Sequence, residues 1–194
     1  MWNASTFSVH DASVAEALNP SSIRTWPADL SEFRNTGGKI ISYHGGQDNQ
    51  ITSFNTERFY KHLSRGMHAS SYELDDFFRF FRISGMFHCN SGPGAWVLGQ
   101  GGGAAAAGVP FESPNNVLAA LVEWVENGVA PDTIEGTKFV NDTVQLGVAF
   151  QRRHCRSGRN LITDINMRAD CVLDTLYEIH TKEEIRRFQA AGYV

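Results

Sequence analysis

The sequence has no hydrophobic run long enough to cross a membrane. Its apolar stretches all fall short of the roughly 18 consecutive residues that a membrane-spanning helix needs. Residues 1–5 also lack the hydrophobic core of a signal peptide, so the chain as written is not expected to be exported. These absences argue against a protein anchored by a transmembrane helix.

Clusters of basic residues are absent as well. Lys and Arg number 17 and Asp and Glu number 21, which gives a formal net charge of −4. Without a basic patch, neither nucleic acid nor an anionic membrane surface is expected as a partner. The 194 residues, 42% hydrophobic and 20% charged, are typical of a globular protein of one domain or a large part of one.

Cysteine is scarce, and its spacing argues against a zinc site. The sequence contains Cys89, Cys155 and Cys171, with no C-x-x-C pair. Cys155 and Cys171 flank a predicted loop and are expected to form a disulfide. The odd count leaves Cys89 without a partner inside the chain.

A strand, a helix and a second strand are predicted between residues 38 and 89. Residues 39–43 and 77–83 are apolar runs of strand length, and residues 54–63 carry apolar side chains at helical spacing. Gly66 follows where a helix typically ends. This order predicts a βαβ unit with a right-handed crossover, and hence an α/β fold.

The flanking segments are predicted to surround this unit. Residues 1–27 are polar and irregular, and residues 132–172 predict short strands and turns. A helix is predicted with Ser113 as its N-cap, Pro114 as its first residue and its end at Gly128. Its apolar stripe is expected to pack on the sheet and consists of Val117, Leu118, Leu121, Val122 and Val125. We expect residues 1–172 to belong to one catalytic domain and residues 173–194 to form a divergent, helical tail.

Two parallel strands cannot make a complete core. A parallel sheet is buried on both faces, and two strands with one or two helices cannot cover the phenylalanines of residues 77–81. The sequence therefore predicts an incomplete sheet, which either another chain or the rest of a larger α/β domain completes.

Each predicted strand leads into a loop that carries a candidate catalytic side chain, Asp48 after the first and His88 after the second. Parallel strands end at the same edge of a sheet, so both side chains should lie there. In α/β-hydrolases the catalytic residues follow the order Ser, Asp or Glu, His, and Asp48 and His88 fit the last two places. The chain contains no G-x-S-x-G motif to supply the serine.

Other roles for these residues stay open at this stage. An Asp in a Gly-Gln-Asp-Asn segment is often a turn residue, and a His after a strand is often a loop residue. His44, Asp48 and His88 together could bind a metal, although no H-x-x-x-H spacing supports this. Cys89 is disfavoured as a nucleophile activated by His88, because sequence neighbours rarely aim their side chains at one another. The other histidines are expected to be surface or structural residues: His44, His62, His68, His154 and His180.

Six short motifs are specific in combination. They are Asp29-Leu30-Ser31-Glu32-Phe33, Gly37-Gly38-Lys39-Ile40-Ile41, Tyr43-His44-Gly45-Gly46-Gln47-Asp48, Gly85-Met86-Phe87-His88-Cys89, Gly92-Pro93-Gly94-Ala95-Trp96 and residues 118–128. Together they resemble the C-terminal part of the fungal tannase and feruloyl esterase family over roughly residues 2–172. Beyond Arg156 the resemblance becomes loose.

The resemblance implies a carboxylic ester hydrolase that acts on small esters of phenolic acids through a serine acyl-enzyme, with Asp48 as the acid and His88 as the base. In that family the cysteine after the catalytic histidine bonds to a cysteine before the nucleophilic serine, so Cys89 is expected to pair upstream of Met1. The nucleophile, a signal peptide for an extracellular location and a lid with structural calcium would also precede Met1. No cofactor is expected within the chain.

Two alternatives follow from the missing serine. The chain is either a truncated, catalytically inactive fragment that keeps Asp48 and His88, or it assembles with another chain that supplies the serine half. A Cys-Ser elbow encoded upstream of Met1 would distinguish a longer enzyme from both.

Thiol counting tests the cysteine assignment. Under oxidising conditions the chain should show one free thiol, Cys89, and three after reduction. Cys155→Ser is the matched variant, because it should release Cys171 and raise the count in the unreduced protein by one. Three free thiols in the unreduced wild type would contradict the bridge between Cys155 and Cys171.

Overall fold

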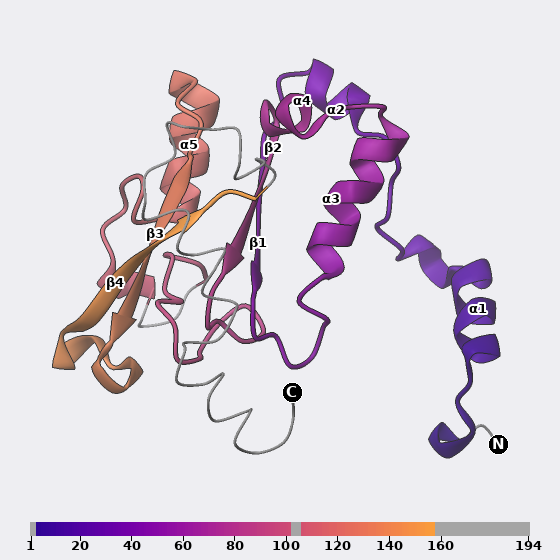
Figure 1. Cartoon of the computed structure of the whole chain (residues 1–194), viewed down its shortest axis with the longest axis horizontal. Coiled ribbons are helices and arrows are strands. Elements are labelled where there is room, and N and C mark those ends of the chain that lie inside the picture. The colour runs from indigo at the N-terminus through magenta and orange to yellow at the C-terminus, as the bar shows by residue number, and fades with distance from the viewer. Residues whose placement is uncertain (1–2, 102–105, 158–194) are drawn as a thin grey trace, which may run out of the picture.

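The computed structural model describes residues 3–101 and 106–157, and a parallel βαβ unit lies at its centre (Figure 1). Strand β1 (Ile40–Gly45) pairs in parallel with β2 (Phe78–Ile83), and helices α3 (Asn55–Gly66) and α4 (Ser71–Asp75) connect them. The predicted α/β unit is confirmed. Among the described residues the parallel sheet has two strands, so it is incomplete as expected.

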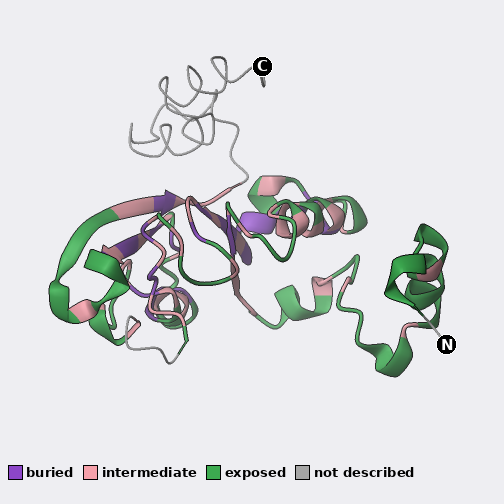
Figure 2. Cartoon of the chain, turned by 90° about the horizontal axis from the view of Figure 1, so that it is seen from below, coloured by how far each residue is buried: buried purple, intermediate pink, exposed green. Residues whose placement is uncertain are grey.

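Two hydrophobic clusters cover the two faces of β2, and α3 and α5 lie on opposite sides of the strand pair (Figure 1). The cluster on the α3 side includes Tyr60, Leu63, Phe78 and Phe80. The cluster on the α5 side includes Phe81, Ile83, Ala120 and Ile134. Strand β2 is therefore an inner strand, whereas residues 40–43 of β1 are only half-buried (Figure 2).

An antiparallel hairpin extends this architecture. Strand β3 (Thr133–Phe139) pairs with β4 (Val148–Cys155), which confirms the predicted short strands as far as residue 157. The end of β4 reaches β2 through an antiparallel bridge between Phe81 and Arg156, and the Ser157 N–H donates to the Phe80 carbonyl at 2.6 Å. The hairpin is thereby joined to the inner strand.

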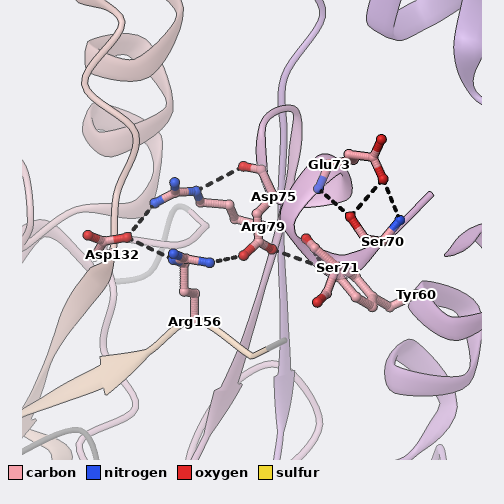
Figure 3. A network of polar contacts seen from close by, with 8 residues as sticks. All are labelled: Tyr60, Ser70, Ser71, Glu73, Asp75, Arg79, Asp132 and Arg156. Carbon is pink, nitrogen blue, oxygen red and sulfur yellow. Dashed lines mark hydrogen bonds and ion pairs between the residues drawn. The ribbon is translucent and has the colours of Figure 1, made fainter. Parts of the chain in front are cut away.

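A buried polar network fixes the hairpin to the βαβ unit (Figure 3). Arg156 forms ion pairs with Asp75 and with Asp132, and the Arg156 and Asp75 side chains are each only 5% exposed. Asp75 also accepts a hydrogen bond from the Tyr60 hydroxyl at 2.9 Å, and Arg79 binds Asp132 at 2.8 Å. Charges this deeply buried are tolerated only when paired, so the network holds α3, α4, β2 and the hairpin in one arrangement.

Helix α5 (Val117–Asn127) differs from the prediction at its start and in its buried face. Its N-cap is Asn116, whose side chain accepts hydrogen bonds from the N–H groups of Leu118 and Ala119, so the expected N-cap Ser113 and the expected first residue Pro114 both precede the helix. The predicted end at Gly128 is confirmed by its left-handed φ of 72°.

The predicted apolar stripe of α5 coincides only in part with its packed face: Val117 packs against the core and Leu121 is half-buried. Leu118, Val122 and Val125 are exposed, and the buried residues are Ala119, Ala120 and Trp124. Small alanines let the helix approach the strands closely, and the Trp124 ring lies 5.3 Å from both the Lys39 and the Arg79 cations. Spacing alone does not distinguish this face from the more hydrophobic one.

The segment expected to be irregular, residues 1–27, contains a helix. Helix α1 (Val9–Leu18) begins with a capping box between Ser8 and Asp11 and ends at Asn19 in the left-handed conformation. Helix α1 buries no residue, so its sequence lacks the apolar periodicity that predicts a packed helix. The chain then returns to the βαβ unit, where Trp26 packs on Phe59 of α3 at 5.1 Å.

The remaining elements are short. Helix α2 (Ser31–Asn35) precedes β1. The 3₁₀ turns are Ala4–Thr6, Pro20–Ser22, Ala106–Gly108, Val140–Asp142 and Val144–Leu146. No helix in residues 3–101 and 106–157 has the length and apolarity to cross a membrane. The predicted tail helix and the boundary at residue 172 lie outside the described residues.

We predict that Asp75→Ala lowers the free energy of unfolding by about 3–5 kcal/mol, because it removes the buried one of the two carboxylates that pair with Arg156. Urea unfolding measures this change. The matched control is Asp76→Ala at the adjacent exposed position, which should change stability by no more than about 0.5 kcal/mol. Equal midpoints for the two variants would contradict the structural role of the network.

Candidate active site

Two loops meet at the carboxyl edge of the parallel sheet, one after β1 and one after β2. The Gly46 N–H donates to the Ile83 carbonyl at 2.9 Å, and the Gln47 N–H donates to the Met86 carbonyl at 3.0 Å. Gly45 lies so close to the backbone of Met86 and Phe87 that a Cβ atom there would clash with their carbonyl oxygens. Glycine at this position allows the close approach that brings the two loops together.

Asp48 accepts three hydrogen bonds from these loops and one from strand β1. Its Oδ1 accepts the N–H groups of Gln50 at 2.8 Å and Ile51 at 2.9 Å. Its Oδ2 lies 3.0 Å from Nδ1 of His88 and 3.1 Å from Nε2 of His44. A carboxylate offers about four acceptor sites, so all of them are used, and the side chain is only 2% exposed.

The surroundings of Asp48 favour its charged form. Burial acts to raise the pKa of Asp48, but the hydrogen bonds from Ile51, Gln50 and His88 outweigh it and hold that pKa well below its usual range. The carboxylate is therefore ionised at neutral pH and acts only as an acceptor.

This acceptor determines where His88 carries its proton. Because a carboxylate cannot donate, the His88 Nδ1 that faces it must bear the hydrogen, and the neutral ring then has its lone pair on Nε2. The His88 side chain is 39% exposed. Within residues 3–101 and 106–157, no serine hydroxyl forms a hydrogen bond with Nε2, which is free to take a proton from a bound molecule.

Two side chains outside the loops hold the His88 segment in place. Lys138 of β3 donates to the Gly92 carbonyl at 2.6 Å. Gln100 donates to the carbonyls of Trp96 at 2.8 Å and Cys89 at 3.3 Å. Cys89 has a φ of 60°, a strained conformation for a non-glycine residue that these contacts support. Sequence reasoning missed both anchors, because Lys138 lies 46 residues from Gly92 and Gln100 lies 11 residues from Cys89, and both bind backbone carbonyls.

His44 was expected to be a surface or structural residue, and its position is more specific than that. It is 9% exposed and contacts both Asp48 and Thr56, whose Oγ1 lies 2.7 Å from Nδ1. His154 is a structural residue, buried with its Nε2 2.9 Å from the Ala95 carbonyl oxygen. His62 packs near Trp26, and His180 lies outside the described residues.

The cysteines divide between the described and undescribed parts of the chain. Cys89 is a free, exposed thiol directly after His88. Cys171 lies outside the described residues, so its bridge to Cys155 stays a prediction. No group of three or more His, Cys, Asp or Glu side chains that could hold a metal ion occurs in the described part of the chain.

Comparison with known proteins identifies relatives of this arrangement. The family model described as "Tannase and feruloyl esterase" matches residues 2–161. A probable feruloyl esterase B-2 of Aspergillus flavus is 63% identical over 155 residues, which cover 80% of this chain and 30% of the relative. The chain thus spans less than a third of the length of that protein.

Solved structures agree with this match. The crystal structure of feruloyl esterase B from Aspergillus oryzae superposes with a TM-score of 0.72 at 42% identity, over 80% of this chain and 30% of that one. A tannin acyl hydrolase from Aspergillus niger gives a TM-score of 0.53 at 26% identity, over 75% and 24% of the two chains. The family match over most of the chain and the shared fold lead to one conclusion: this chain belongs to the tannase and feruloyl esterase family.

Proposed function

We propose that this chain supplies the acid, Asp48, and the base, His88, of a Ser-His-Asp site that hydrolyses carboxylic esters of phenolic acids. The observation that carries the proposal is the 3.0 Å contact between His88 Nδ1 and a buried Asp48 carboxylate at the carboxyl edge of the parallel sheet. Relatives named feruloyl esterases support the choice of ester. A tannin acyl hydrolase among the similar structures supports the broader class of phenolic acid esters.

The geometry suits general acid–base catalysis. Nε2 of His88 takes the proton of a serine hydroxyl as the oxygen attacks the ester carbonyl, and then returns it to the departing alcohol. Water attacks the acyl-enzyme by the same proton route in the second half of the cycle. Asp48 keeps the proton on Nδ1 and stabilises the imidazolium that forms, because its own pKa stays low.

The nucleophilic serine has no candidate in this sequence, which lacks the G-x-S-x-G motif. We infer that the serine lies in a segment outside this sequence, and that this segment packs against the loops beside His88. The free and exposed Cys89 would bond there to a cysteine that precedes the serine, which would pin the base to the nucleophile. Such a bond forms in an oxidising compartment, so the proposal implies an extracellular protein.

A chimera tests this function directly. The chain replaces the matching segment of Aspergillus oryzae feruloyl esterase B, and hydrolysis of methyl ferulate and methyl gallate is measured. His88→Ala should lower kcat/KM by roughly 10³-fold or more, and Asp48→Asn should cost a similar or smaller factor through the wrong imidazole tautomer. The control His10→Ala, on the exposed face of α1, should hydrolyse both esters like the parent chimera.

Two outcomes would count against the proposal. Near-normal turnover by His88→Ala would remove the base from its role. A folded chimera with no turnover before any substitution would favour the catalytically inactive fragment.

The low pKa of Asp48 predicts a specific pH dependence of stability. A carboxyl whose pKa is lower in the folded than in the unfolded state stabilises the fold above its unfolded pKa of about 3.9, and loses this contribution as the pH falls further. The difference in unfolding free energy between the wild type and Asp48→Asn should therefore shrink as the pH drops below about 4. Urea titrations from neutral to acidic pH measure it, and a constant difference would contradict the low pKa.

A further inference from the structure

A second imidazole shares the carboxylate oxygen that His88 contacts. His44 is the fifth residue of β1, and its Nε2 lies 3.1 Å from Oδ2 of Asp48. Its other nitrogen, Nδ1, lies 2.7 Å from Oγ1 of Thr56 in the first turn of α3. The His44 side chain therefore links Asp48 to β1 and, through Thr56, to α3, in addition to the loop that carries Asp48.

The protons in this chain of contacts can be assigned from chemistry. Oδ2 of the ionised Asp48 only accepts, so Nε2 of His44 must carry a hydrogen. The neutral ring then bears its lone pair on Nδ1, and the Thr56 hydroxyl, which can either donate or accept, donates to it.

We propose that His44 is a positioning residue for the Asp48–His88 pair, and that Thr56 fixes it as the Nε2–H tautomer. This inference rests on the proposed function. Oδ1 is held by two backbone N–H groups and Oδ2 by His44, so the plane of the carboxylate is set before His88 becomes charged. Preorganised hydrogen bonds of this kind avoid reorganisation at the moment of proton transfer.

The same hydrogen bond keeps the proton of His88 in place. Each donor that binds the Asp48 carboxylate makes it a weaker base, and four donors bind it here. The proton on Nδ1 of His88 therefore stays on the ring, and Asp48 stabilises the imidazolium by charge alone. Loss of His44 would leave one buried acceptor site of Asp48 without its donor and would weaken the restraint on rotation of the carboxylate about Cβ–Cγ.

Nitrogen NMR on the full 194-residue chain tests the assignment without any activity measurement. At neutral pH we expect the His44 ring to show a protonated Nε2 in slow exchange with water and an unprotonated Nδ1. A bare Nε2, or a ring protonated on both nitrogens, would overturn the proposal. This experiment uses the wild type, so it does not depend on whether a variant folds.

Kinetics of the chimera described above test the positioning role. His44→Leu removes the donor and should lower kcat by about 10- to 100-fold with little change in KM, by analogy with residues that orient metal ligands. His44→Gln offers an amide N–H in place of Nε2–H and should recover part of that loss. Thr56→Val keeps the hydrogen bond from His44 to Asp48 but removes the hydroxyl that binds Nδ1 of the ring. Its decrease in kcat should therefore be smaller than that of His44→Leu.

The outcomes separate this inference from the proposed function. Wild-type kcat in His44→Leu, or equal losses in the Leu and Gln variants, would overturn the positioning role while an inactive His88→Ala variant upholds the ester hydrolase. Retained turnover in His88→Ala would overturn both. If His44→Leu does not fold, Thr56→Val and the NMR of the wild type still decide.

Discussion

The parallel pairing of β1 with β2 is the interaction on which the rest of this structure depends. Gly45 stands opposite Ile83 in the register, so the two strands end at the same level and their loops begin side by side. Hydrogen bonds from Gly46 to Ile83, the last residue of β2, and from Gln47 to Met86 in the second loop continue the ladder. A slip of one residue would turn the side chains of β2 to the wrong faces and separate Asp48 from His88.

The packing around the strand pair serves the same geometry. Phenylalanines on both faces of β2 make it an inner strand, and the ion pairs of Arg156 attach the hairpin to it. The hairpin in turn delivers Lys138 to the loop that carries His88. Stability and function are therefore coupled through shared elements: a change in the buried network would reach the site through the position of β3.

Sequence patterns predicted the strands and helices that are encoded by residues close together in the chain. Apolar runs located β1 and β2, and strand order together with the family resemblance selected Asp48 and His88 as candidates. Tertiary contacts escaped this reasoning, since His44 meets Thr56 only because α3 folds back along β1. The predicted start of α5 was wrong because a proline such as Pro114 is common in the first turn of a helix. The structure instead has the N-cap at Asn116. Helix α1 was missed because its capping box was the only signal it carries.

The separation of Asp48 and His88 along the chain has a consequence for folding. Their contact closes a loop of only 40 residues, most of which lie in α3, α4 and β2. The entropic cost of loop closure grows only with the logarithm of loop length, and contacts between near neighbours in sequence favour rapid folding. Asp48 and His88 can thus come together as the βαβ unit forms, at a stage set by local contacts rather than by the arrival of any distant segment.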